Sequence, residues 1–212
     1  MNGTGRTGTR SAAPGGLPLA GLILLAVACG VGLLVAAVAR GAELPDLRAV
    51  RDLQGRFTID VPVDWQVATT YRDPALSAKS PVRSGGLSDT VEVTVRDLPV
   101  AISPENCGRQ IAQVMHFTIH HWETLREGAD TMGGLAAYSR IYNWRTKDGQ
   151  DRRSVQTCAM MGRRAFVVIG TTMNTPDQVN EDLPGIMRIM GTFHPVTSST
   201  PETNQAPPGS QR

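Results

Sequence analysis

The feature that most constrains this chain is an uncharged apolar run near its N-terminus. Residues 17–39 read LPLAGLILLAVACGVGLLVAAVA and contain no charged side chain. Because an α-helix rises about 1.5 Å per residue, roughly 20 apolar residues cross the hydrocarbon core of a bilayer. The run is slightly longer than that, so the sequence predicts a single transmembrane anchor or signal-anchor. Every other part of the chain must then lie on one side of the membrane or the other.

The residues before the run set its predicted orientation. Residues 1–16 contain Arg6 and Arg10 and no acidic side chain. Positively charged flanks stay in the cytoplasm, so we expect the rest of the chain on the extracytoplasmic side. The same segment is rich in Gly, Thr and Ser without apolar periodicity, which predicts a disordered cytoplasmic tail.

A cleaved signal peptide is the alternative to an anchor. Ala37 and Ala39 form a small-x-small site at which a signal peptidase could cut. Signal peptides have apolar cores of roughly 7 to 15 residues, and this run exceeds that length. The sequence therefore favours an uncleaved anchor over a domain that is secreted after cleavage.

The remainder of the chain has the size of one domain. Residues 40–54 form a mixed-charge linker, which we expect to be a stalk with a short helical turn. Residues 55–195 make up the domain, and 196–212 have the composition of a disordered tail. The net charge is +2 and the basic residues are scattered. No basic patch suggests a nucleic-acid partner.

Period-two patterns predict an antiparallel sheet. In residues 89–96, Val91, Val93 and Val95 alternate with polar side chains, which indicates a strand buried on one face. Residues 165–172 are apolar on both faces, so both sides of the sheet need cover. The segment 73–88 is rich in Pro, Gly and Ser and is expected to be a loop. The predicted strands span residues 56–61, 89–96, 135–144, 154–161 and 165–172, and a further strand begins at residues 65–68.

Two helices are predicted to supply this cover. Ser103 is an N-cap followed by Pro104, and apolar residues at helical spacing continue to about Arg126. Cys107 falls on the apolar stripe of this helix. A second helix begins after Thr175, and Pro184 is expected to kink or split it.

The order of these elements resembles the PsbP-like family. The opening F-x-I-x-x-P-x-x-W comprises Phe57, Ile59, Pro62 and Trp65, and Phe193 follows the closing helix. The family includes the extrinsic PsbP subunits of photosystem II, the DcrB-related bacterial proteins and a Ran-binding nuclear import factor. The resemblance implies an α+β fold, an antiparallel sheet flanked by helices in an α/β/α sandwich, here preceded by a single transmembrane helix. It also implies a binding or assembly role rather than catalysis.

One stripe of side chains on a predicted strand has the composition of a protein contact surface. Tyr138, Arg140, Tyr142 and Trp144 share one face at period two. Aromatic residues and arginine dominate the energetics of protein interfaces when they are accessible. The alternative is that a helix covers this face.

The two cysteines of the domain are expected to form a disulfide. Cys107 faces the sheet from the first turn of its helix, and Cys158 lies in a strand with both faces covered. In an oxidising compartment such a pair invites a bridge. Two buried free thiols are the alternative, which a cytoplasmic domain would favour.

One further set of side chains has the residue types of a metal site. If the long helix continues, His116, His120 and Glu123 share one face, and these residue types bind Zn²⁺. That face is opposite the apolar stripe, so an exposed polar surface is the expected interpretation, with no metal and no cofactor. No nucleophile elbow, P-loop or dinucleotide fingerprint is present in the sequence.

The sequence thus predicts a non-catalytic, membrane-anchored, extracytoplasmic PsbP-like protein that binds a protein partner. The first alternative is a DcrB-related secretion or effector chaperone, which would hold an apolar client segment against the sheet. The second is a metal-dependent enzyme that uses the two histidines and the glutamate.

Overall fold

The computed structural model describes residues 46–82 and 87–197. The predicted anchor, both flanking segments of residues 1–45 and most of the C-terminal tail lie outside the described residues. Within them, no helix is long and apolar enough to cross a membrane. The elements are β1 (Leu47–Arg51), β2 (Phe57–Pro62), β3 (Gln66–Thr69), β4 (Leu76–Lys79), β5 (Thr90–Asp97), α2 (Pro104–Thr118), β6 (His120–Met132), β7 (Leu135–Arg145), β8 (Asp151–Met161), β9 (Arg164–Met173), α3 (Pro176–Gly191) and β10 (His194–Pro195).

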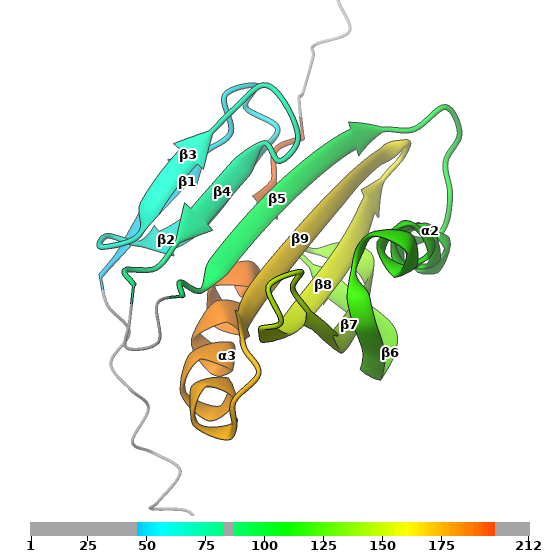
Figure 1. Ribbon diagram of the computed structural model, residues 1–212. Helices are drawn as coiled ribbons and strands as arrows, with labels where there is room; N and C mark the ends of the chain where they lie inside the picture. Colours follow the sequence, from blue (N-terminus) through cyan, green and yellow to red (C-terminus); the bar gives the residue numbers. More distant parts are fainter. Residues whose placement is uncertain (1–45, 83–86, 198–212) are drawn as a thin grey trace, which may run out of the picture. The chain divides into compact units, whose positions relative to one another are not determined.

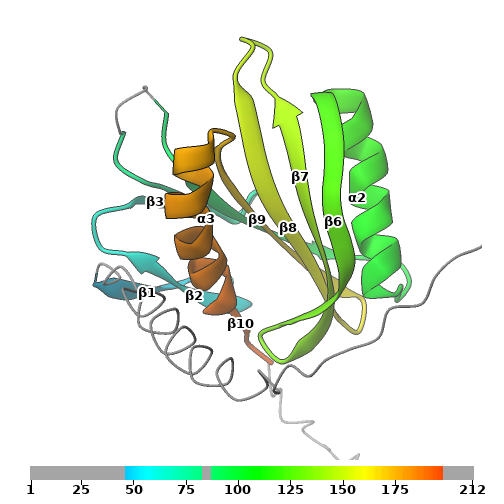
Figure 2. The same ribbon diagram turned by 90° about the horizontal axis from the view of Figure 1, so that it is seen from below.

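The strands form two antiparallel sheets. The larger sheet has seven strands in the order β3-β4-β5-β9-β8-β7-β6, and the smaller has three in the order β1-β2-β10. Helices α2 and α3 lie on opposite faces of the larger sheet (Figures 1 and 2). The mixed α+β architecture with antiparallel strands agrees with the fold class that the sequence predicts.

The main core lies between the larger sheet, α3 and β2. The apolar side chains of β2 and β5 alternate with more exposed ones, so one face of each strand enters the core. Phe57 and Phe193 stack with ring centroids 5.5 Å apart, and Phe166 meets Phe193 edge-on at 5.4 Å. Helix α3 comes so close to β9 that a Cβ on Gly170 would lie 2.1 Å from Ile186. The residues of the family-like opening and closing segments are therefore packing residues.

A second, smaller cluster lies under α2. Cys107 contributes from the helix, and Cys158, Ala165 and Val167 contribute from β8 and β9. Strand β9 is thus buried on both faces, which confirms the need for cover on each side.

The helix predicted for residues 103–126 is wrong in its second half. Ser103 caps α2 as expected, since its hydroxyl accepts a hydrogen bond from the Asn106 amide at 3.1 Å. The helix ends at Thr118, and Ile119 is already extended. Residues 120–132 then form β6, which pairs along its length with β7. The long ladder outweighs the helical spacing of Trp122 and Leu125, because tertiary pairing routinely overrides weak local propensity.

Two segments predicted as irregular or helical are strands. Residues 47–51, inside the expected linker, form β1 against β2 rather than a helical turn. Residues 76–79, inside the expected loop, form β4, and Leu76 and Ala78 are fully buried. Both strands are only five and four residues long. Runs this short carry too little periodicity to stand out from turn-rich surroundings.

A proline within α3 and a glycine pair between β6 and β7 complete the description of the backbone. Helix α3 runs from Pro176 to Gly191 with Pro184 inside it, so it is not split. Because proline has no N–H group, the carbonyl of Asn180, four residues earlier, receives no helical hydrogen bond. Asn180 and Pro184 are both exposed, so water can hydrogen-bond to this carbonyl instead. Gly133 and Gly134 have φ values of +58° and +77° and form the two-residue turn between β6 and β7.

Candidate functional site

The stripe predicted on residues 138–144 lies on the face of β7 that points toward α2. Tyr142 is fully buried and Arg140 is 5% exposed. Helix α2 approaches at Gly108, where a Cβ would lie 2.8 Å from the Tyr138 ring. The helix therefore covers much of the stripe, as the alternative interpretation of the sequence allowed, and the open aromatic surface is not formed.

Arg140 connects α2 to the sheet through polar contacts. Its Nε and Nη2 contact the Glu127 carboxylate at 2.7 and 2.6 Å, and Nη1 donates to the Gly108 carbonyl at 3.2 Å. The guanidinium also lies 5.9 Å from the Trp122 ring centroid and 6.0 Å from that of Tyr138. These contacts satisfy a buried cation, which would otherwise be strongly unfavourable.

An aromatic cluster continues this interface. Trp122 stacks on Tyr142 with ring centroids 3.9 Å apart, and His116 lies 5.2 Å from Trp122. The Tyr142 hydroxyl donates to the Met115 sulfur at 3.7 Å. Burial raises the pKa of Tyr142 to about 12. Trp122 comes from β6, so the error in the helix boundary concealed its role.

Trp144, the last residue of the stripe, forms a hydrogen bond with the neighbouring strand β8. Trp144 donates from its indole nitrogen to Ser154 Oγ at 2.9 Å, and Ser154 also shares a hydrogen bond with Thr171 at 2.8 Å. Arg140 and Tyr142 are therefore interior residues, whereas Tyr138 and Trp144 are half-buried.

The predicted disulfide between Cys107 and Cys158 is confirmed. The two Cα atoms are 6.3 Å apart and the residues are separated by 51 positions. Both cysteines are buried, at 4% and 0% exposure. The bridge joins the first turn of α2 to β8. It therefore stabilises the interface between α2 and the sheet, to which Arg140 also contributes.

The histidine face considered for a metal does not exist. His116 is in the last turn of α2, whereas His120 and Glu123 are on β6, so the i, i+4, i+7 spacing of one helix does not apply. Glu123 accepts a hydrogen bond from the Asn143 amide at 3.0 Å. Across residues 46–82 and 87–197, no group of three His, Cys, Asp or Glu side chains could hold a metal ion.

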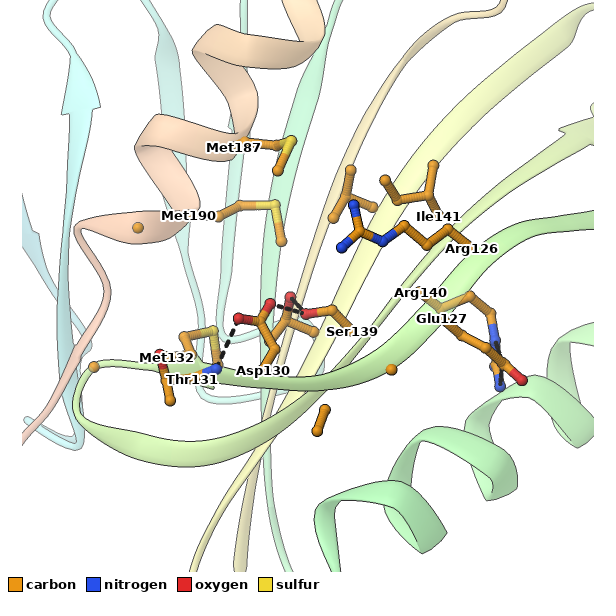
Figure 3. Close-up of a pocket in the computed structure, with 16 residues that line it drawn as sticks. Arg126, Glu127, Asp130, Thr131, Met132, Ser139, Arg140, Ile141, Met187 and Met190 are labelled. Carbon is orange, nitrogen blue, oxygen red and sulfur yellow. Dashed lines mark hydrogen bonds and ion pairs between the residues drawn. The ribbon is translucent and has the colours of Figure 1, made fainter.

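The accessible concavity lies on the other face of the sheet. A groove of about 530 Å³ runs between α3 and the strands β6, β7 and β8 (Figure 3). Its apolar part includes Met187 and Met190 from α3, with Ile141 and Val155 from the sheet. Methionine side chains adapt to irregular partners, which suits a surface that binds another molecule.

A short polar chain forms one end of this groove. Asp130 accepts hydrogen bonds from Ser139 Oγ at 2.5 Å and from the Thr131 amide at 2.8 Å. Ser139 in turn shares a hydrogen bond with Thr157 at 2.7 Å. These hydrogen bonds hold Asp130, Ser139 and Thr157 in fixed positions at the wall of the groove.

The groove was not predicted from the sequence. Its lining comes from three consecutive strands and from α3, which follows only after β9, and β6 was predicted to be part of a helix. One available signal was residues 126–132, where Gly128 interrupts the helical pattern and Thr131 and Met132 precede the Gly133-Gly134 turn. That pattern is typical of a strand entering a tight hairpin.

Comparison with known proteins relates the fold to solved structures only. No family model matches the sequence, and no curated protein matches it significantly. The cyanobacterial PsbP protein CyanoP from Synechocystis sp. PCC 6803 superposes with a TM-score of 0.57 at 11% identity, over 74% of this chain and 96% of that one.

Two other solved structures superpose at similar levels. The Saccharomyces cerevisiae Ran-binding protein Mog1p gives a TM-score of 0.52 at 12% identity, over 71% of this chain and 95% of its own. LpqN, described as involved in cell envelope biogenesis of Mycobacterium tuberculosis, gives 0.51 at 16% identity, over 77% and 97%.

These superpositions define the class of domain. In this chain the superposed architecture is an antiparallel sheet with one helix on each face and a small sheet beside the core. The domain has the PsbP-like fold, as the opening and closing motifs of the sequence predicted. At these identities the likeness concerns the fold alone.

Proposed function

We propose that this chain is a non-catalytic, membrane-anchored binding or assembly protein whose PsbP-like domain works on the extracytoplasmic side. The observation that carries the proposal is the groove between α3 and β6–β8. It is accessible, and it combines apolar side chains with the polar chain of Asp130, Ser139 and Thr157. A protein partner is the occupant that best suits a domain of this fold class.

The compartment is supported by two independent features. The Cys107–Cys158 bridge is of the kind that forms in oxidising compartments. The uncharged run 17–39, preceded by Arg6 and Arg10, has the length and flanks of an anchor with its C-terminal side outside.

The solved structures with this fold add a further line of support. One is described as Ran-binding and another as involved in cell envelope biogenesis. A role in binding for the present chain extends those descriptions by analogy of fold.

The membrane arrangement is tested by reporters fused after Arg212. A periplasmic or extracellular alkaline phosphatase reporter should be active and a cytoplasmic fluorescent reporter should be dark. The opposite pattern would remove the extracytoplasmic assignment and favour the chaperone alternative. Finding Arg40 as the mature N-terminus would instead replace the anchor by a cleaved signal peptide.

Binding through the groove is tested by photo-crosslinking in the native host. A photoreactive phenylalanine analogue replaces Met187 or Thr131, which line the groove, or Val100, an exposed residue in the loop before α2. The same protein adduct from the two groove positions and none from Val100 supports the proposal. Equal adducts from all three positions, or none, contradict it.

A further inference from the structure

A free strand edge runs along the groove. Strand β6 is the last in the order of the larger sheet, and it pairs only with β7 among the described strands. From Arg126 to Met132 this pairing has no register shift. The outer edge of this stretch therefore presents backbone N–H and C=O groups without a strand partner in the described part of the chain. Such an edge is a template for an added strand.

The acidic side chains of β6 are all engaged with groups of the domain itself. Glu127 pairs with Arg140, Asp130 accepts from Ser139 and the Thr131 amide, and Glu123 accepts from Asn143, as described above. All three carboxylates of β6 are thus committed to contacts within the domain.

Arg126 differs from these acids. It is exposed, and it makes no hydrogen bond or ion pair with any residue in the described ranges. It pairs in register with Ile141, on the α3 side of the sheet, and its side chain reaches over the groove (Figure 3). The Arg140–Glu127 pair lies on the other side of β6 in the same view. The groove therefore has an unpaired cation at its rim.

Gly128 leaves space beside this cation. It lies two residues from Arg126 on the same face of the strand, and a Cβ built on it would meet no atom within 4 Å. Its φ is not positive, so the backbone does not require glycine there. Across the groove, Met187 is 48% exposed. An incoming side chain has room above Gly128 and an apolar contact on α3.

We propose that the groove takes an extended peptide segment of a partner protein, which adds to the free edge of β6. An acidic side chain of the segment pairs with Arg126, and a neighbouring apolar side chain on the same face packs over Gly128 against Met187. Backbone hydrogen bonds supply sequence-independent affinity, and the two side chains supply selectivity. The inference rests on the proposed function and names the chemistry of its partner.

The test uses the purified full-length chain in detergent and arrayed peptide pools. Each pool contains nine-residue peptides with a fixed central residue, Glu, Gln or Lys, and random flanks. We expect the Glu pool to bind about tenfold more tightly than the Lys pool, the change that one charge-assisted contact produces. Peptides methylated on alternate backbone nitrogens should lose binding, because they cannot pair as strands.

Matched variants locate the site. Arg126→Glu should reverse the preference between the Glu and Lys pools, whereas the same reversal at exposed Lys147, in the β7–β8 hairpin, should change nothing. Gly128→Leu should weaken binding of every pool by filling the groove. Gly185→Leu is the control, because a Cβ built on Gly185 also meets no atom within 4 Å and Gly185, on α3, does not line the groove. Unchanged unfolding by urea shows that each variant is folded.

Several outcomes overturn the inference. The proposal that the groove binds an acidic peptide is contradicted by equal binding of the three pools or by no binding of any pool. It is also contradicted if Arg126→Glu retains the preference for the Glu pool. A second copy of the chain is the other occupant to exclude. In a Cys29→Ser background, a disulfide dimer of Gly128→Cys that Ala129→Cys does not form would assign the edge to self-pairing. Groove-specific photo-crosslinks together with these results would still uphold the proposed function.

Discussion

The two faces of the larger sheet at β6 and β7 are built from neighbouring residues and have opposite character. On the α2 side, Arg140 is buried, hydrogen-bonded and closed in by a disulfide-linked helix. On the α3 side, Arg126 is exposed and unpaired within the described residues, above a groove. The comparison shows that the presence of arginine and aromatic residues on one face of this sheet does not identify that face as the binding surface. The arginine with satisfied partners lies on the structural face, and the arginine without a partner among the described residues lies on the accessible one.

Loss of the disulfide on the α2 side is expected to have the largest effect on the free energy of unfolding. Replacing Cys107 and Cys158 by alanine should lower the free energy of unfolding by about 4 kcal/mol, because a loop of this length gains chain entropy in the unfolded state. Urea denaturation of the full-length chain measures it, and Cys29→Ser serves as the control. A loss below about 1 kcal/mol would mean that Arg140 and the aromatic cluster hold α2 without the bridge.

The two arginines provide the next test. Arg140→Met should cost about 3 kcal/mol, since it removes a buried cation and leaves the Gly108 carbonyl without its partner. Arg126→Met should change stability by less than about 0.5 kcal/mol, as is usual for an exposed side chain without contacts. Equal losses in urea denaturation would contradict the division between the two faces.

Alkaline pH tests the buried aromatic cluster. The folded-state pKa of Tyr142, about 12, exceeds the unfolded value of 10.0. Folding therefore favours the protonated phenol, so this stabilisation is complete below pH 10 and disappears as pH rises to about 12. We expect a loss of about 2 kcal/mol across that window in the wild type.

The control variants separate Tyr142 from other groups that titrate at high pH. Tyr142→Phe should flatten this part of the stability profile. Tyr71→Phe should leave it unchanged, because Tyr71 is 72% exposed. Identical slopes for the two variants would show that the phenol of Tyr142 does not control the transition.

The smallest expected effects come from the same substitution on each face. Gly128→Ala should be neutral or stabilise by up to about 1 kcal/mol, since it meets open space and glycine is unfavourable within a strand. Gly108→Ala should instead destabilise by about 1 kcal/mol, because the new methyl group presses on the Tyr138 ring and this outweighs the gain in helix propensity. Thermal unfolding measures both, and effects of the same sign would contradict the comparison.

Residues with strong local signals were predictable from the sequence. Val91, Val93 and Val95 alternate cleanly, Ser103 and Thr175 cap their helices, and Cys107 faces the sheet as its helical position requires. In each case the physical signal lies within about ten residues. The disulfide followed because two such local signals faced the same interface.

The accessible site was not predictable in the same way. Trp122 and Leu125 continue the helical spacing of α2, and pairing with β7 overrides this local spacing and makes residues 120–132 a strand. The groove then depends on where α3 passes β6, a contact between elements that lie about 50 residues apart in the chain. Arg126 has no sequence feature that distinguishes it from other exposed arginines, since its significance lies in the partners it lacks.

The bridge between α2 and β8 also turns part of the chain into a covalent ring. Residues 107–158 contain β6, β7 and the hairpin tip at Lys147. A single proteolytic cut anywhere inside the ring leaves both pieces attached through sulfur, so neither is released until a reductant acts. In a compartment that contains proteases and little reductant, the free edge of β6 can be exposed to solvent and still survive a nick without loss of the domain.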